Sequence, residues 1–167
     1  MKFIYLIIFF SLFVQTSFAT NYQYFLSPYF YQNSDSYQMN GMIRITYNIG
    51  KLFDKAANNI KNESNQNIFI KCANSQKTDI ILYLYPTSFY NPLMTTFYTD
   101  LEVRTFKAPG QLKNSFILKH QTHKKLWEYP QDDISKHYEE LIKKLLRKVK
   151  IRSFDYQIDG SFCRVFN

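Results

Sequence analysis

The feature that most constrains the fold is a long amphipathic segment that begins after Pro130. Apolar residues recur there every three or four positions, which predicts an α-helix with one wide apolar stripe. The stripe consists of Ile134, Tyr138, Leu141, Ile142, Leu145, Leu146 and Val149. Asp132 or Asp133 is placed to cap the start of this helix. Because the stripe must be buried, the rest of the chain has to provide a second layer of structure.

The middle of the chain predicts strands that can form this layer. The expected strands cover residues 42–47, 67–73, 79–86, 96–107 and 115–129. Residues 79–85 are almost continuously apolar, which is typical of a central strand with both faces covered. Residues 115–129 are expected to form a two-stranded hairpin that turns near Gln121, Thr122 and His123.

Two further features complete the predicted fold. Asn48 is suited to cap a helix whose apolar positions run from Ile49 to Ile60. Residues 151–158 and 162–166 can each add a strand after the long helix. The expected fold class is α+β, a single domain with an antiparallel β-sheet and two helices packed on one face.

The first nineteen residues have the pattern of a signal peptide. Lys2 gives a positive start, residues 3–14 are apolar except for one serine, and the small residues Ser17 and Ala19 precede a cleavage site. An uncleaved membrane anchor is the alternative, although the apolar run is short for a span of about twenty residues. Cleavage predicts an exported protein, periplasmic or extracellular, whose mature part has no transmembrane span.

Residues 20–41 are expected to be an N-terminal arm. Pro28, the polar run 33–36 and Asn40-Gly41 interrupt regular structure in this stretch. The domain itself is then expected over residues 42–167.

Two cysteines, Cys72 and Cys163, lie in the mature part of the chain. An exported chain meets an oxidising compartment, and these residues allow only one intramolecular pairing, so we expect a Cys72–Cys163 disulfide. The bridge would close a loop of about ninety residues and contribute roughly 4–5 kcal/mol to stability. Two separate buried thiols are the alternative.

The chain is basic, with a net charge of +8. Loss of residues 1–19 removes Lys2 and leaves 20 basic against 13 acidic side chains, a net charge of +7. The densest basic run comprises Lys143, Lys144, Arg147, Lys148, Lys150 and Arg152. It is a candidate face for binding an anion or an acidic partner, such as lipid head groups. The alternative is a solvated helix surface whose bases suit the helix dipole. No nucleic-acid-binding module accompanies the charge, so nucleic acid is not an expected partner.

Patterns of catalysis and metal binding are sparse in the sequence. No glycine-rich phosphate loop or nucleophile elbow occurs, so no catalytic residue and no cofactor is predicted. Asp100 and Glu102 share one strand face about 7 Å apart and could act as acid and base, but a solvated face beside Arg104 is the favoured interpretation.

The histidines are the only candidate metal set. They are His120, His123 and His137. The positive charge of Lys119, Lys124 and Lys125 opposes a bound cation, so surface histidines are favoured and no metal site is predicted.

One segment has the order of elements of a known group of proteins. The buried run Asp79-Ile80-Ile81-Leu82, a hairpin closing at Leu126-Trp127, and the helix from Tyr138 to Val149 follow one another. In this order, residues 78–149 resemble small bacterial envelope accessory proteins, such as the auxiliary lipoproteins of ABC-type lipid transporters and related assembly lipoproteins. The resemblance implies a fold of this kind and a place in the cell envelope. The lipid-bearing N-terminal cysteine of those families is missing here.

These features leave three hypotheses for function. The first is an exported, non-enzymatic envelope or periplasmic accessory protein that binds a protein partner or an anionic lipid surface. The second is a secreted factor of a host-associated organism that binds an acidic surface. The third is an unrecognised hydrolase that uses Asp100, Glu102 or a histidine.

Overall fold

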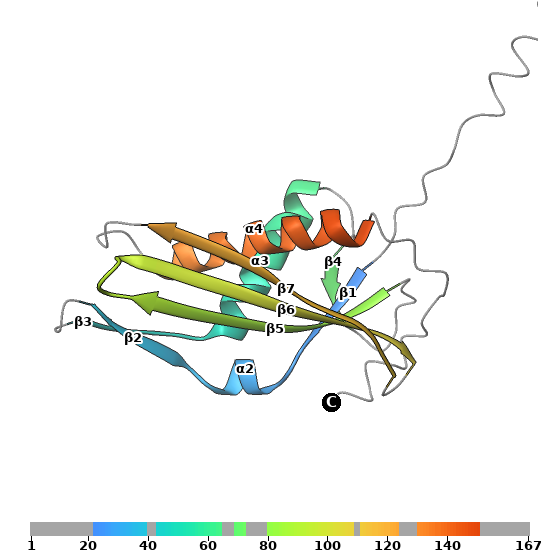
Figure 1. Ribbon diagram of the computed structural model, residues 1–167, viewed down its shortest axis with the longest axis horizontal. Helices are drawn as coiled ribbons and strands as arrows, with labels where there is room; N and C mark the ends of the chain where they lie inside the picture. Colours follow the sequence, from blue (N-terminus) through green and yellow to red (C-terminus); the bar gives the residue numbers. More distant parts are fainter. Residues whose placement is uncertain are drawn as a thin grey trace, which may run out of the picture.

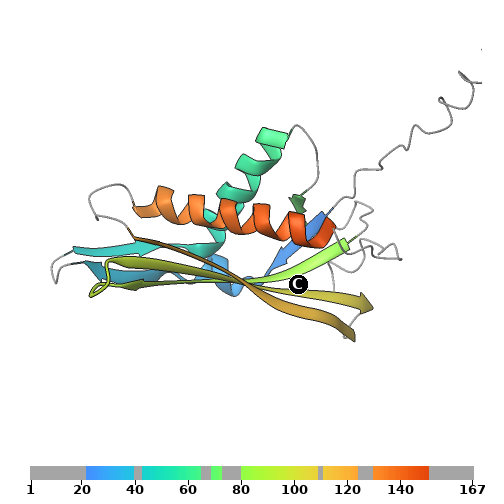
Figure 2. The same ribbon diagram turned by 45° about the horizontal axis from the view of Figure 1, so that its top comes forward.

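The computed structural model describes residues 22–39, 43–64, 69–72, 80–108, 111–123 and 130–150. Within these ranges a five-stranded sheet forms one layer, and two long helices lie across one of its faces (Figures 1 and 2). The predicted signal peptide and the strands predicted over 151–158 and 162–166 lie outside the described residues, and so does the predicted hairpin strand near Trp127.

The main sheet has the strand order β4-β1-β5-β6-β7. Its strands are β1 (Tyr22–Leu26), β4 (Phe69–Lys71), β5 (Ile80–Asn91), β6 (Thr96–Ala108) and β7 (Gln111–His123). The α+β fold class is confirmed. The sheet is mixed rather than wholly antiparallel, because β1 runs parallel to both of its neighbours while β5, β6 and β7 form an antiparallel meander.

The strand β1 corrects the prediction of an N-terminal arm over residues 20–41. All five of its residues are buried, and Tyr24 pairs with Lys71 of β4 and with Leu82 of β5. A strand with neighbours on both sides belongs to the centre of the domain. The prediction failed because the partners of β1 lie far along the chain, where no local pattern links them to it.

The meander corrects a second prediction, the hairpin over residues 115–129. The strand β7 runs without a turn through Gln121, Thr122 and His123, and these residues pair with β6. The strand β5 also extends beyond the predicted end at Pro86, as far as Asn91. Its pairing with β1 ends at Leu84, because β1 itself ends at the partner residue Leu26.

A small ribbon joins the N-terminal part of the chain to the first long helix. It pairs β2 (Asp35–Met39) with β3 (Ile43–Tyr47), and the single turn of helix α2 (Tyr29–Gln32) precedes it. The predicted strand over 42–47 is therefore confirmed, although it lies outside the main sheet. Gly50 has no room for a side chain, because a Cβ there would come within 2.9 Å of the Phe30 carbonyl oxygen.

The first long helix is α3 (Ile49–Ser64), and it begins where the sequence predicts. The Asn48 side chain caps it by accepting the Lys51 N–H at 2.9 Å. The same side chain donates to the carbonyl of Tyr31 at 2.8 Å, which fixes α2 against the start of α3.

The second long helix is α4 (Pro130–Lys150), and its predicted stripe is confirmed. Six of the seven stripe residues are fully buried, and Leu146 is half-buried against the core. The helix starts at Pro130, so Asp132 and Asp133 occupy its first turn rather than the cap. Proline and acids both suit that turn, because the missing N–H costs nothing there and the dipole favours negative charge.

Candidate functional site

The three histidines that form the candidate metal set of the sequence do not meet at one site. His120 packs edge-on against His137, with ring centroids 4.7 Å apart, and His123 Nδ1 lies 2.7 Å from Thr96 Oγ1. His120 and His123 are three residues apart in β7, so their side chains leave opposite faces of the sheet. Burial, together with the charge of Lys144, lowers the pKa of His120. Across the described ranges, no three His, Cys, Asp or Glu residues are grouped as a metal site requires.

The two strand carboxylates are both engaged in ion pairs. Glu102 accepts a hydrogen bond from Arg104 Nε at 2.7 Å, and Asp100 lies 3.7 Å from Lys119 Nζ. The Arg104 guanidinium also stacks 4.5 Å over the ring of Tyr85. These contacts match the solvated strand face favoured by the sequence.

The basic run on α4 is partly occupied by contacts within the chain. Lys143 Nζ lies 3.4 Å from Glu63 Oε2. Lys144 Nζ donates a hydrogen bond to the backbone carbonyl of Lys119 in β7 at 3.3 Å. Lys148 Nζ lies 4.1 Å from the centroid of the Phe116 ring, in a cation–π contact. Arg147 is exposed. The side chain of Lys150, like Arg152, lies outside what the structure describes. An anion-binding role of this face stays a prediction.

The predicted disulfide has one described end. Cys72 follows β4, and its N–H donates to the carbonyl of Tyr24 at 2.8 Å, which fixes its place beside β1. Cys163 lies outside the described residues, so the Cys72–Cys163 bridge stays a prediction.

A polar cluster around Asp54 connects α3 to β1, β4 and the short helix α2. Asp54 Oδ1 accepts hydrogen bonds from the hydroxyls of Tyr24 at 2.9 Å and Tyr31 at 2.8 Å, and Lys71 Nζ lies 3.1 Å from Oδ2. Burial, reinforced by the Asp54 carboxylate, raises the pKa of both tyrosines. The four residues come from β1, α2, α3 and β4, so we interpret the cluster as a structural clamp.

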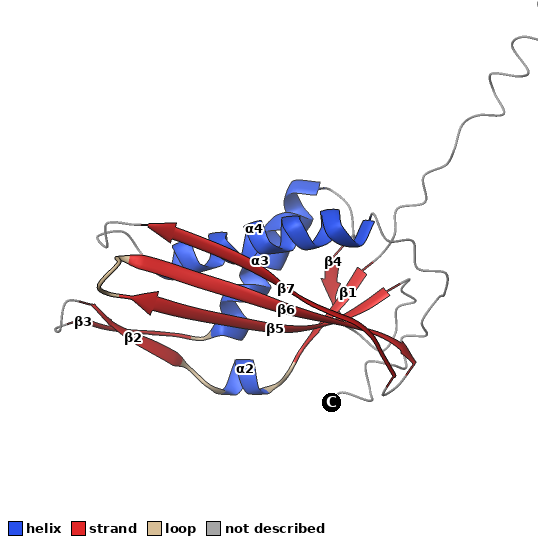
Figure 3. Cartoon of the chain, in the orientation of Figure 1, coloured by secondary structure: helices blue, strands red, loops and turns tan. Residues whose placement is uncertain are grey.

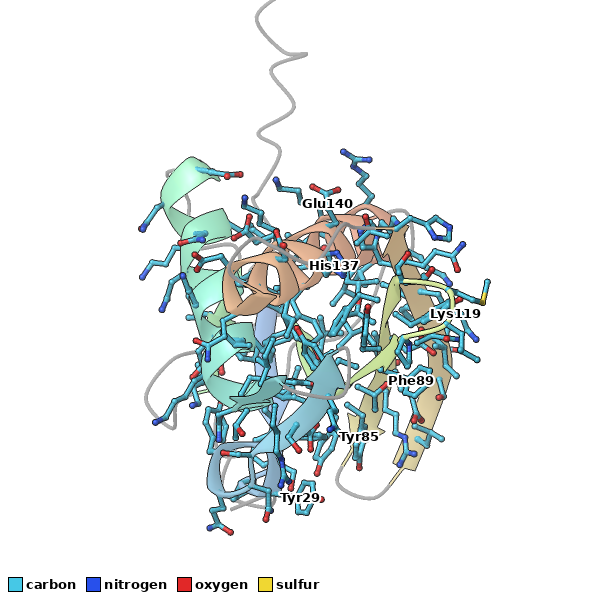
Figure 4. The ribbon with its side chains drawn as sticks, turned by 90° about the vertical axis from the view of Figure 1, so that its left-hand side faces the viewer. Tyr29, Tyr85, Phe89, Lys119, His137 and Glu140 are labelled. Carbon is cyan, nitrogen blue, oxygen red and sulfur yellow. The ribbon has the colours of Figure 1, made fainter. Side chains whose placement is uncertain are left out.

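The face of the meander turned away from the helices has a different composition from the covered face. Its residues alternate with the buried ones: Tyr83, Tyr85, Thr87 and Phe89 in β5, Tyr98, Asp100, Glu102 and Arg104 in β6, and Ser115, Ile117, Lys119 and Gln121 in β7. We call this surface the open face. Phe89 and Lys119 project from it, whereas His137 lies on the other side, on the face of α4 that packs against the sheet (Figure 4).

At one end of the open face, the β5–β6 turn displays apolar side chains to solvent. Leu93 is 95% exposed, Phe89 61% and Met94 54%. We call these three residues the tip patch. The turn that carries two of them lies at the end of the sheet, on the same side of the molecule as the end of the β2–β3 ribbon (Figure 3, tan). Large exposed apolar side chains gathered in one place mark interaction sites more often than scattered ones do.

The turn is held in one conformation by its own sequence. The Asn91 side-chain oxygen accepts the N–H groups of Leu93 at 3.0 Å and Met94 at 3.2 Å, which is the local bonding expected of asparagine before a proline-containing turn. Thr95 adopts a φ of 46°, a left-handed conformation uncommon for a residue other than glycine. Leu93 and Met94 are thus displayed on a defined scaffold.

A shallow groove lies behind the tip patch on the same surface. It has a volume of about 480 Å³ and is lined by Phe89, Tyr98, Asp100, Lys119, His120 and Gln121. The rings of Phe89 and Tyr98 stack with centroids 6.3 Å apart, and the Tyr98 hydroxyl lies 3.8 Å from the sulfur of Met94. Tip patch and groove therefore form one continuous candidate site.

This site was not predicted from the sequence. The available signal was Asn91-Pro92, a turn dipeptide, followed by two apolar residues between two strands. A turn usually carries polar residues, so Leu93-Met94 was the anomaly that could have revealed it.

Comparison with known proteins gives no functional assignment. No protein-family model matches the chain. No curated protein matches it either. Among solved structures it is similar to one described as "Crystal structure of uncharacterized protein", with a TM-score of 0.47 and 14% sequence identity. That similarity covers 78% of this chain and 90% of the other.

Proposed function

We propose that the protein is an exported, non-enzymatic accessory protein of the cell envelope that binds its partner through the tip patch. The observation that carries the proposal is the ordered display of Leu93 and Met94, held to solvent by the Asn91 side chain. Solvating apolar side chains costs free energy, and a rigid turn cannot fold them back onto the protein. A binding partner accounts for that arrangement.

Two features of the sequence support the place of action. The signal-peptide pattern of residues 1–19 directs the chain out of the cytoplasm. The resemblance of residues 78–149 to envelope accessory proteins supports a binding role there through the strand at 80–82 and the helix ending after Val149, but not through the hairpin, because β7 is straight where that hairpin was expected to turn. Within the described site, Asp100 and Glu102 are engaged by Lys119 and Arg104, which suits a binding surface better than an acid–base pair.

Cell fractionation of a Leu93→Ser/Met94→Ser variant tests the proposal. The wild-type protein should remain with the envelope fraction, and the variant should be recovered in the soluble periplasmic or culture fraction. Ile117→Ser is a matched control, because Ile117 is 54% exposed on the same face but lies away from the tip. Retention of the double variant together with the wild type would contradict the proposal.

A secreted factor that binds an acidic surface through α4 is the second candidate. It is favoured by Arg147, which is exposed on the basic helix face. Full recovery of the wild-type protein in culture medium, with binding that weakens as salt rises, would support it instead.

A further inference from the structure

We propose that the partner of the tip patch is an anionic phospholipid bilayer, into which the β5–β6 turn inserts. This inference rests on the proposed function and names its ligand. The tip combines a graded change in polarity, a small apolar patch and a rigid turn with the positive charge of the chain.

Side chains on the open face change in polarity with distance from the tip. Leu93 and Met94 come first, in the turn itself. The cross-strand pair Phe89–Tyr98 lies two residues behind the turn pair Asn91–Thr96, or about 7 Å.

The charged row of Asp100 and Lys119 lies two residues further back, about 13 Å from the end of the strands. From the turn back along β5 and β6 the order is apolar, then aromatic, then charged, with the polar Gln121 and His123 of β7 beside the aromatic and turn rows. A bilayer has the same order from hydrocarbon through the interface, where tyrosine is enriched, to the head groups.

The size of the patch also favours lipid over protein. A stable protein interface uses about 20 to 30 residues a side and about 800 Å² per partner. The tip patch offers only three apolar side chains, and Leu93 at 95% exposure makes almost no contact with the rest of the described protein. Insertion into hydrocarbon needs no complementary partner surface, and a small apolar patch combined with basic charge supplies the two signals that membrane binding takes.

The rigidity of the turn makes insertion less costly. The hydrogen bonds from the Leu93 and Met94 N–H groups to Asn91 satisfy backbone donors that hydrocarbon cannot. The same bonds fix both side chains outward before contact, so little conformational freedom is lost on binding.

The net positive charge of the chain favours an anionic bilayer over a neutral one. The chain has 21 Lys and Arg against 13 Asp and Glu, which draws it towards anionic surfaces. Lys119, with a side chain 73% exposed, sits at head-group depth, and its 3.7 Å pair with Asp100 is weak enough to be exchanged for a phosphate.

Vesicle cosedimentation of the exported protein tests the inference. The probes are phosphatidylcholine vesicles with and without phosphatidylglycerol. We expect binding that is tighter with phosphatidylglycerol, and a loss of about a hundredfold in Leu93→Ser/Met94→Ser because two apolar side chains no longer enter hydrocarbon. Ile117→Ser should bind within about twofold of the wild type, since Ile117 lies about 20 Å from the tip.

A fluorescent probe measures insertion directly. Leu93→Trp in a Trp127→Phe background should show a blue shift with vesicles and quenching by lipids brominated deep in the acyl chain. Ile117→Trp in the same background should show neither. A Leu93→Trp emission that does not move while the protein is vesicle-bound would overturn insertion.

The outcomes separate this inference from the proposed function. Wild-type protein that binds neither vesicle overturns the bilayer as ligand. If envelope retention is nevertheless lost in Leu93→Ser/Met94→Ser, the proposed function stands and the tip binds a protein. If the double variant binds vesicles as the wild type does, the inference fails and the basic face of α4 accounts for the binding.

Discussion

The two faces of the meander are built from alternate residues of the same strands, yet one packs into the core and the other faces solvent. On the covered face, Leu84, Leu101 and Val103 have no exposed surface, because α3 and α4 pack over them. On the open face, the next residues along, Tyr85, Glu102 and Arg104, join in an ion pair and a cation–π contact. The alternation predicts that substitutions on the open face will change stability much less than substitutions on the covered face.

The largest expected effect comes from the covered face. Leu145→Ala should lower the free energy of unfolding by about 2–5 kcal/mol, since it leaves a cavity at a position without exposed surface. Denaturant unfolding followed by circular dichroism measures the change. Arg147→Ala, two residues away on the exposed side of the same helix, should stay within about 0.5 kcal/mol. Equal losses of unfolding free energy in the two variants would contradict the difference between the covered and exposed sides of α4.

The Asp54 clamp should be next in size. Asp54→Ala leaves the Tyr24 and Tyr31 hydroxyls without their acceptor, which should cost about 1–3 kcal/mol of unfolding free energy. Tyr31→Phe removes one of these bonds and should cost less. The same denaturation experiment checks both, and a Tyr31→Phe effect as large as that of Asp54→Ala would contradict the shared-acceptor account.

The clamp also predicts a dependence of stability on alkaline pH. Burial and Asp54 raise the pKa of Tyr24 and Tyr31 above the usual 10.0. Above about pH 10 the unfolded chain loses these protons while the folded chain keeps them, so stability should be complete below that pH and fall above it. Denaturation curves from about pH 8 to 11 measure the fall. A Tyr24→Phe/Tyr31→Phe variant should show a smaller one; an unchanged slope would rule out these two groups.

A smaller effect on stability is expected from the basic helix face. The quadruple variant with Lys143, Lys144, Arg147 and Lys148 changed to Gln should unfold within about 1 kcal/mol of the wild type, because its contacts are exposed ion pairs and stem packing. Its binding to anionic vesicles should weaken through lost attraction but keep the fluorescence signature of insertion at Leu93→Trp. A destabilised quadruple variant would show that this face contributes to the fold.

The smallest effect on stability is expected at the tip. Leu93→Ser should leave the free energy of unfolding unchanged within about 0.5 kcal/mol, because the side chain is 95% exposed and makes no packing to lose. Thermal unfolding of the wild type and variant without vesicles checks this. A measurable loss would show that Leu93 supports the turn as well as displaying it.

The sequence predicts the covered layer well because its signals are local. The stripe of α4 repeats within one helix, and the Asn48 cap acts on a backbone N–H three residues away. The open-face pair of Glu102 and Arg104 was also accessible, since both residues stand two apart in one strand.

The parts that were missed depend on partners distant in the sequence. Nothing near Tyr24 indicates that it pairs with both Lys71 and Leu82. The polar residues Gln121 to His123 have the composition of a turn, but the long β6 beside them holds them in a straight strand. The tip patch was missed because its meaning depends on exposure, which a sequence pattern does not state.

The place of β1 has a consequence for the order in which the chain can fold. The strands β5, β6 and β7 follow one another and can pair as soon as they meet, whereas Tyr24 must wait for both Lys71 and Leu82 before it gains its neighbours. If a chain crosses a membrane N-terminus first, β1 therefore emerges before the two strands that flank it, β4 and β5. The pairing of β1 can then be completed only after Ile80–Leu84 of β5 has followed it.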